Sequence, residues 1–277
     1  MKKTEIGIFK VTALLLLFSL LSFTSCSKEE TSKQELIKEN INETVWVFLM
    51  AGQSNMAGRG AIEAPDLVTN DRILSINSEN EWIIAKEPLH FYELSDALDC
   101  GMSFAQEMLK HVPDSVTIAM VPCAVGGSSV FQWLNDEKHR NVKLFTNFTE
   151  KVQLSKKKGV IKGILWHQGE RNANDTDLPD YENALLQLFS KFRASVGNNE
   201  LPIILGEIGR FAEPDEKALC FEKINQIIRT VASRNDNLGF VSSEGLDHRG
   251  DHLHFNSEGQ RELGRRYAMK YMEILKN

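Results

Sequence analysis

The sequence predicts an α/β domain built on a mainly parallel β-sheet with helices on both faces. Two observations lead to this fold class. Uniformly apolar runs recur along the chain, as in strands that are buried on both faces of a sheet. Segments with apolar side chains at helical spacing lie between them. Alternation of such strands and helices is typical of a parallel sheet that helices cover on both sides.

Five apolar runs are predicted to form the strands of the sheet. They cover residues 44–51, 116–121, 160–166, 203–207 and 238–242. Two further short strands, or the arms of a hairpin, are predicted within a long polar insert, at residues 73–75 and 82–85. A glycine pair, Gly126 and Gly127, makes the turn after the second of the five runs.

Helices are predicted between these strands and after the last of them. They cover residues 103–111, 143–156, 180–195 and 217–233. Apolar side chains recur there at helical spacing, for example at Leu185, Leu188 and Phe192. Ser257 and Gln260 fit a capping box, which predicts that a final helix begins at Ser257.

Length, charge and cysteine content set the broad class of the protein. The chain has 277 residues, of which 42% are hydrophobic, and this suits one α/β domain with a full core. Acidic and basic residues are interspersed and the formal net charge is −6, so nucleic acid is not an expected partner. Three cysteines follow residue 26, which allows at most one disulfide among Cys100, Cys123 and Cys220. The sequence leaves the oligomeric state open.

The first 25 residues are predicted to be a lipoprotein signal peptide. A lysine-rich start precedes a short apolar run at residues 11–23, which is too short for a typical membrane span. The residues Phe-Thr-Ser-Cys that follow resemble a bacterial lipobox, so Cys26 is expected to carry a lipid. An ordinary signal peptide cleaved nearby is the alternative.

A polar tether and one domain are expected after the leader. Residues 26–43 begin with the lipidated cysteine and continue as a polar stretch with too few apolar side chains to order itself. Residues 44–277 then form the domain. We expect the protein to be exported and anchored to a bacterial membrane only through this lipid, facing the periplasm or the cell surface.

Small and polar residues follow the ends of the predicted strands. Ser54 comes after the first strand, Gly127 after the second, Gln168 after the third, and a loop at residues 251–254 after the last. The carboxyl ends of parallel strands lie at one edge of a sheet, where ligands bind in such folds. The sequence therefore predicts a functional site at this edge.

Ser54, Asp251 and His254 supply the three groups that acyl-transfer hydrolysis requires. A neutral serine hydroxyl is a poor nucleophile and needs an adjacent base, for which His254 is the first choice. Asp251 precedes it by three residues and can hold the tautomer of the imidazole and stabilise the imidazolium. His252 is the rival candidate for the base.

Four segments resemble sequence blocks of the SGNH-hydrolase superfamily. They are residues 52–56 (GQSNM), 122–129 (PCAVGGSS), 166–170 (WHQGE) and 251–256 (DHLHFN). They are similar to the branch that holds sialate O-acetylesterases and acetylxylan esterases of carbohydrate esterase family 6, and they occur in family order. The resemblance implies a three-layer α/β/α, flavodoxin-like fold. It also implies a cofactor-free serine hydrolase that removes acetyl groups from xylan, sialic acid or a related glycan through an acyl-enzyme intermediate.

The resemblance also assigns the groups around the nucleophile. It implies an oxyanion hole made of the backbone N–H groups of Ser54 and Gly127 and the side-chain amide of Gln168. Asn55 is expected to tether the nucleophile turn or to touch substrate. Glu170 and Arg171 are expected to order their loop or to contact sugar hydroxyls. Arg171 departs from the family pattern, because many relatives carry serine there.

Two other functions fit parts of the sequence. His248, His252 and His254 crowd one loop with two aspartates, and such a cluster can hold zinc for a metal-dependent hydrolase. A surface lipoprotein that binds glycans without hydrolysing them is the second alternative. The presence of Ser54, Asp251 and His254 together favours the serine hydrolase over both.

Overall fold

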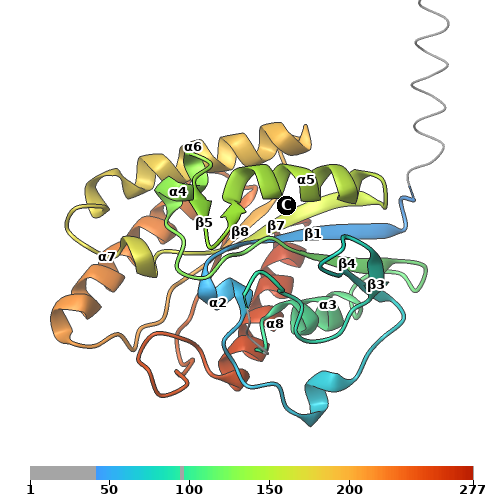
Figure 1. The fold of residues 1–277 in the computed structure, drawn as a ribbon, viewed down its shortest axis with the longest axis horizontal. Coiled ribbons are helices and arrows are strands. Elements are labelled where there is room, and N and C mark those ends of the chain that lie inside the picture. The colour runs from blue at the N-terminus through green and yellow to red at the C-terminus, as the bar shows by residue number, and fades with distance from the viewer. Residues whose placement is uncertain (1–41, 94–96, 277) are drawn as a thin grey trace, which may run out of the picture. The chain divides into compact units, whose positions relative to one another are not determined.

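A seven-stranded β-sheet forms the centre of the computed structural model, which describes residues 42–93 and 97–276 (Figure 1). Its strands are β1 (Val45–Gly52), β2 (Ile73–Ile76), β3 (Trp82–Ile84), β4 (Thr117–Pro122), β7 (Val160–His167), β8 (Ile203–Gly206) and β9 (Leu238–Val241). They lie in the order β3-β2-β4-β1-β7-β8-β9. All neighbours pair in parallel except β2 and β3, which form an antiparallel hairpin at one edge. The predicted fold class is confirmed.

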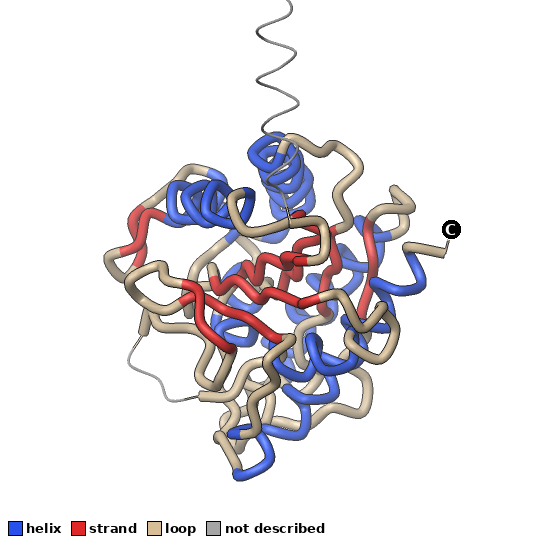
Figure 2. The backbone as a smooth tube through the Cα atoms, turned by 90° about the vertical axis from the view of Figure 1, so that its right-hand side faces the viewer, coloured by secondary structure: helices blue, strands red, loops and turns tan. Residues whose placement is uncertain are grey.

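Helices cover both faces of this sheet (Figure 2). One face packs against α3 (Gly101–Met108) and α8 (Ser257–Ile274), through side chains such as Phe104 and Tyr267. The other face packs against α4 (Val130–Leu134), α5 (Leu144–Lys156), α6 (Leu178–Val196) and α7 (Asp215–Ala232). Two apolar cores on either side of the sheet give the expected three-layer arrangement.

The central strand β1 brings the functional edge of the sheet together. Six of its eight residues from Val47 onward are fully buried or nearly so, because β4 and β7 flank it and helices cover both faces. Its last residue, Gly52, pairs with His167 at the end of β7. The segments that begin at Ser54 and Gln168 therefore leave the sheet side by side.

Several short elements were not expected from the sequence. They are the one-turn helix α2 (Ser54–Ala57), the 3₁₀ helices η1 (Ala64–Leu67) and η2 (Glu170–Asn172), the helix α4, and a hairpin of β5 (Lys138–His139) and β6 (Val142–Lys143). Each is too short to show a hydrophobic period. Three of them, α2, η2 and the hairpin, lie next to residues at the carboxyl ends of the strands.

The final helix begins at Ser257 as predicted, but its N-cap lies one residue earlier than the predicted capping box implies. Asn256 is the N-cap, and its side-chain oxygen accepts a hydrogen bond from the N–H of Gly259 at 2.8 Å. Ser257, the predicted cap, is already helical and donates its hydroxyl to the carbonyl of Ala61 at 2.7 Å. Both residue types are good N-caps, so a distant partner for Ser257 decides between them.

The structure tests the predictions for the cysteines but not those for the leader. Cys100, Cys123 and Cys220 are all free thiols, so no disulfide links them. Within residues 42–93 and 97–276, no helix is long and apolar enough to cross a membrane. The predicted signal peptide at residues 1–25 and the lipidated Cys26 lie outside the described residues.

Candidate active site

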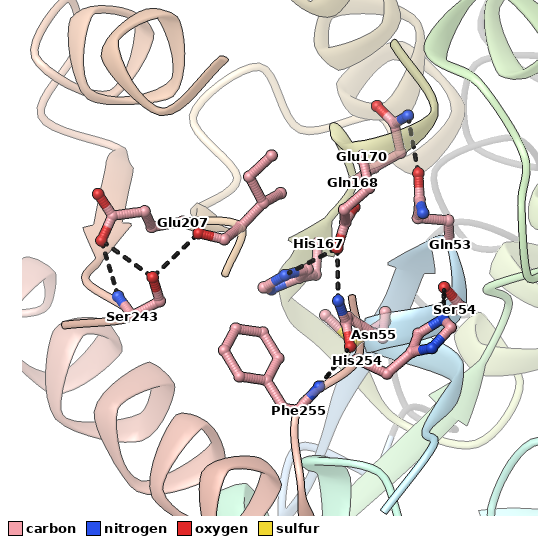
Figure 3. Close-up of polar contacts among 12 residues, drawn as sticks. Gln53, Ser54, Asn55, His167, Gln168, Glu170, Glu207, Ser243, His254 and Phe255 are labelled. Carbon is pink, nitrogen blue, oxygen red and sulfur yellow. Dashed lines mark hydrogen bonds and ion pairs between the residues drawn. The ribbon is translucent and has the colours of Figure 1, made fainter. Parts of the chain in front are cut away.

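The structure brings Ser54, His254 and Asp251 into one hydrogen-bonded chain. Figure 3 shows its contact between Ser54 and His254. The Nε2 atom of His254 lies 2.9 Å from the Oγ atom of Ser54. Its other ring nitrogen, Nδ1, lies 2.8 Å from a carboxylate oxygen of Asp251. These three residues come from the first and last parts of the domain, and their meeting at the sheet edge is the arrangement that the sequence predicts. Such a chain can draw a proton from the serine hydroxyl.

Glycine at position 52 allows the sharp turn that presents Ser54. Its φ angle is 137°, and a Cβ atom there would lie 2.1 Å from the carbonyl oxygen of His167. No side chain fits in that space, so β1 and β7 approach closely only because residue 52 is glycine. Ser54 is the first residue of α2, and its backbone N–H therefore has no acceptor within the helix.

Asp251 organises the loop that carries His254. One of its oxygens accepts hydrogen bonds from the N–H groups of Leu253 at 3.0 Å and of His254 at 2.8 Å. His252 points elsewhere: its ring packs on that of His248 with centroids 4.1 Å apart, and its Nδ1 atom lies 3.3 Å from the carbonyl of Phe211. In the structure His254, and not His252, faces Ser54.

The protonation states of the two titratable groups suit this geometry. Burial raises the pKa of Asp251, but the backbone and side-chain hydrogen bonds of His254 and the N–H of Leu253 outweigh it and lower the pKa to about 2. Burial also lowers the pKa of His254 below its usual value, although Asp251 opposes this shift. Asp251 is therefore a carboxylate at neutral pH, and His254 is a neutral imidazole that can accept a proton.

Gly127 lies in the loop after β4, which is bonded to the end of β1 where Ser128 Oγ donates to the carbonyl of Gly52. Its φ angle of 76° turns the chain in a conformation that favours glycine. Among the described residues its N–H donates to no acceptor, whereas the preceding N–H of Gly126 donates to the carboxylate of Glu93. A Cβ atom at Gly127 would lie 3.7 Å from His139 and 3.8 Å from Arg140, both of the β5–β6 hairpin.

The structure places Gln168 differently from the prediction. Its side chain is fully buried, and its amide nitrogen lies 2.6 Å from Asn172 Oδ1, 3.1 Å from Gln53 Oε1 and 3.3 Å from the carbonyl of Ser128. Two N–H bonds already face three acceptors, so neither is free for an oxyanion. The amide oxygen accepts from the hydroxyl of Tyr181 at 3.2 Å. This geometry does not support Gln168 as a direct oxyanion donor.

Sequence reasoning missed Gln53, which links Gln168 to the nucleophile turn. Its side chain is 3% exposed, and its oxygen also accepts from the backbone N–H of Arg171 at 3.2 Å. The signal was its position directly before Ser54 in the first sequence block. Gln168 thus orients the residue next to the nucleophile instead of reaching the nucleophile itself.

Asn55 and Glu170 are both buried and lie next to Ser54 and His254. Asn55 is 1% exposed, and its side chain bonds to the carbonyl of Leu253 at 3.1 Å and to the N–H of Phe255 at 3.1 Å. Its amide also donates to Glu170 at 2.5 Å. Asn55 therefore tethers the nucleophile turn, as expected, while the buried Glu170 has no surface to offer a sugar.

Four arginines lie on segments next to Gly127, Gln53 and Asp251. Arg59 bonds to Glu93 at 2.7 Å, and Arg140 pairs with the same carboxylate. Arg249 lies 3.4 Å from Asp251, and the charges of Arg59 and Arg249 both act on His254. Arg171, which the sequence singled out, is exposed beside Gln53. Glu93 and the three arginines other than Arg171 were missed, because they come from the long insert, the short hairpin and the last loop.

The histidine loop does not form a metal centre. Within the described part of the chain, no group of three or more His, Cys, Asp or Glu side chains is placed to hold a metal ion. The Nδ1 atom of His248 accepts from the N–H groups of Gly250 at 3.0 Å and His252 at 3.2 Å. Both ring nitrogens of His254 are already engaged by Ser54 and Asp251.

Comparisons with known proteins show the family of the chain. A family model described as carbohydrate esterase, sialic acid-specific acetylesterase matches residues 44–273. A probable carbohydrate esterase from Arabidopsis thaliana is 30% identical over 250 residues, which make up 82% of this chain and 90% of that protein. The match includes all four sequence blocks of the site, since they lie between residues 52 and 256.

Solved structures show the same fold. The X-ray structure of the Arabidopsis thaliana protein has a TM-score of 0.73 at 29% identity, and the match covers 82% of this chain and 98% of that one. NanS gives a TM-score of 0.68 at 15% identity, covering 84% of this chain and 98% of its own. A carbohydrate acetylesterase from Xanthomonas citri gives 0.60 at 18% identity, covering 83% and 56%. At such low identity, the last two similarities concern the fold alone.

Proposed function

Because the chain belongs to the sialic acid-specific acetylesterase family of carbohydrate esterases, we propose that it removes O-acetyl groups from glycans with Ser54 as nucleophile. The observation that supports this most directly is the contact of 2.9 Å between Ser54 and His254, with Asp251 behind the imidazole. A serine so placed beside a neutral base is activated for attack on a carbonyl carbon.

The reaction then has two halves. Ser54 Oγ bonds to the acetyl carbon while His254 Nε2 takes its proton, and the carbonyl oxygen becomes an oxyanion near the N–H groups of Ser54 and Gly127. The C–O bond to the sugar breaks, and His254 returns the proton to the sugar oxygen. Water, deprotonated by His254, attacks the acetyl-serine, and acetate leaves with Ser54 restored. Asp251 stabilises the imidazolium in both halves.

Arginine side chains at the mouth favour a negatively charged glycan. Arg140 lies beside Gly127, Arg249 lies beside Asp251 and the exposed Arg171 follows the buried Glu170, whereas the whole chain has a formal net charge of −6. A carboxylate on the sugar, as in sialic acid, would be attracted to this local positive charge. Within the candidate glycans, we therefore place O-acetylated sialic acid ahead of acetylated xylan.

Acetate release from a panel of acetylated glycans and an aryl acetate tests the proposal. The wild-type protein should release acetate, and Ser54→Ala should lower kcat by roughly three orders of magnitude or more while remaining folded. A Ser54→Ala variant that kept most of the activity would remove Ser54 from the mechanism. Loss of wild-type activity in a chelator, restored by a metal ion, would favour the metal-dependent alternative.

The N-terminal segment supports a further proposal about location. The lipobox-like residues before Cys26 and the polar stretch up to residue 43 suit a lipid-anchored, exported domain on a tether. Cys26→Ser should leave esterase activity unchanged and move the protein from the membrane to the soluble fraction, as fractionation and mass spectrometry of the N-terminus would show. Unlipidated wild-type protein, cleaved elsewhere, would contradict it.

A further inference from the structure

Glu170 is a buried carboxyl group for which the reaction above has no use. Its side chain is 2% exposed, and one of its two oxygens has no hydrogen-bond partner among the described residues. The other oxygen accepts from Asn55 Nδ2 at 2.5 Å. A buried carboxyl group with one neutral side-chain donor is costly to ionise, so its presence next to the site needs an explanation.

Asn55 connects Glu170 to both halves of the site. It follows Ser54 directly, and its side chain bonds to the backbone on either side of His254, at the carbonyl of Leu253 and the N–H of Phe255. Its own carbonyl accepts from the side chain of Gln260 at 3.1 Å. The Asn55 amide thus fixes the distance between the nucleophile turn and the loop of the base, and Glu170 holds that amide in place (Figure 3).

The surroundings of Glu170 contain one cation and otherwise neutral groups. His167 on β7 lies 3.8 Å away, and burial lowers the pKa of its imidazole to about 3, so it is uncharged at neutral pH. Burial raises the pKa values of Tyr181 on α6 and Tyr267 on α8, which stay protonated. Lys217 on α7 is the cation whose charge acts on Glu170.

Building on the proposed function, we propose that Glu170 is a positioning residue, whose ionised carboxylate holds Asn55 and thereby keeps Ser54 and His254 in contact. A charged acceptor binds the amide more strongly than a neutral one. Burial raises the pKa of Glu170 to about 7, against the opposing hydrogen bond of Asn55. Protonation near neutral pH then loosens the brace and lowers kcat before His254 itself is protonated.

The pH dependence of kcat for Glu170→Gln tests this role. The variant imitates the protonated side chain, so its kcat at pH 9 should be about fivefold lower than that of the wild type, with KM nearly unchanged. The wild type should lose this advantage as the pH falls through about 7, whereas the variant should stay level until His254 titrates. A variant with the wild-type plateau and acid limb would overturn the proposal.

A double-mutant cycle with Asn55→Ala shows whether Glu170 acts through Asn55. Replacing Glu170 should cost several-fold in the wild type and almost nothing in the Asn55→Ala background. Additive losses would mean that Glu170 acts by another route and would overturn the proposal. If Asn55→Ala does not fold, the pH profile decides alone. A wild-type protein inactive on every acetyl ester would instead refute the proposed function, which separates the two failures.

Discussion

Two buried glutamates at the ends of neighbouring strands are held in opposite ways (Figure 3). Glu207 follows β8, and its carboxylate accepts hydrogen bonds from Arg210 at 2.9 Å, from Arg229 at 2.5 Å and from the backbone N–H of Ser243 at 2.8 Å. Glu170 follows β7 and has one neutral donor, Asn55. The first charge is compensated on several sides, while the second is nearly alone.

The difference separates a group that supports the fold from one that supports the site. A paired and hydrogen-bonded carboxylate fixes the end of its strand, and breaking it leaves partners unsatisfied. An uncompensated carboxyl group costs folding free energy when it ionises, so its benefit must lie elsewhere. Its contact with Asn55, one residue from Ser54, indicates where: perturbed carboxyl groups gather at reacting sites.

The largest expected effect on kcat comes from His254, whose loop is bonded through Asn55 to Glu170. His254→Ala should lower kcat by roughly three orders of magnitude, because the serine then has no base. His252→Ala is the matched control from the same loop, and its kcat should stay within a few-fold of the wild type, since its ring packs on His248. Steady-state kinetics on an aryl acetate measures both.

If the kcat effects of His252→Ala and His254→Ala were reversed, the contrast between the two glutamates would lose its basis. If His252→Ala were the crippled variant, the chain from Asp251 to Ser54 would not be the reacting one. Glu170 and Asn55 would then brace an idle loop. Circular dichroism of both variants is needed alongside, because a loss of fold would lower activity without testing the base.

The sequence predicts the frame well, and it predicts that Ser54, Asp251 and His254 lie together. Strands buried on both faces show as apolar runs, so β1 at Val45–Gly52 and β7 at Val160–His167 match the predicted 44–51 and 160–166 within a residue. Ser54 and His254 follow from strand-end topology and from a loop in which Asp251 is only three residues away.

Side-chain direction was not predictable in the same way. Gln168 lies at the expected place, but its amide bonds to Gln53 of a separate segment and to Asn172, which the turn of η2 brings back toward it, and the local sequence reveals neither contact. The contact between Arg59 and Glu93 also joins residues that are distant in sequence, so the sequence does not predict it. Glu170 reads from sequence as a polar loop residue, and only the packing around it shows that it is buried.

The next effect is on stability and sharpens the contrast between the two glutamates. The pKa of Glu170 is raised in the folded protein from an ordinary 4.5 to about 7, so between these values the folded state binds the extra proton. The wild type should therefore lose roughly 3 kcal/mol of unfolding free energy relative to Glu170→Gln as the pH rises from 4.5 to 7. Urea unfolding of both proteins at several pH values measures the difference.

The direction of this change in unfolding free energy shows whether Glu170 positions the site or only supports the fold. Relative to the wild type, Glu170→Gln should gain unfolding free energy as the pH rises from 4.5 to above 7. Above pH 7 its kcat should nevertheless be lower than that of the wild type. If the two proteins showed parallel pH dependence, Glu170 would titrate at its ordinary value and the buried charge would carry no cost. Both properties falling together would assign Glu170 to the fold, like Glu207.

The smallest expected effect is that of Glu207→Gln, the matched substitution at the end of β8. Glu207→Gln removes the charge that Arg210 and Arg229 share, but these arginines are 41% and 36% exposed and water can solvate them. The free energy of unfolding should therefore fall by only about 1–3 kcal/mol.

The kcat of the folded enzyme should not change, because Glu207 contacts Ser242 and Ser243 and lies away from Ser54. Denaturant unfolding and steady-state kinetics on the folded protein separate the two quantities. A several-fold drop in kcat for Glu207→Gln would erase the contrast with Glu170, because any charge removed at this edge would then disturb the site.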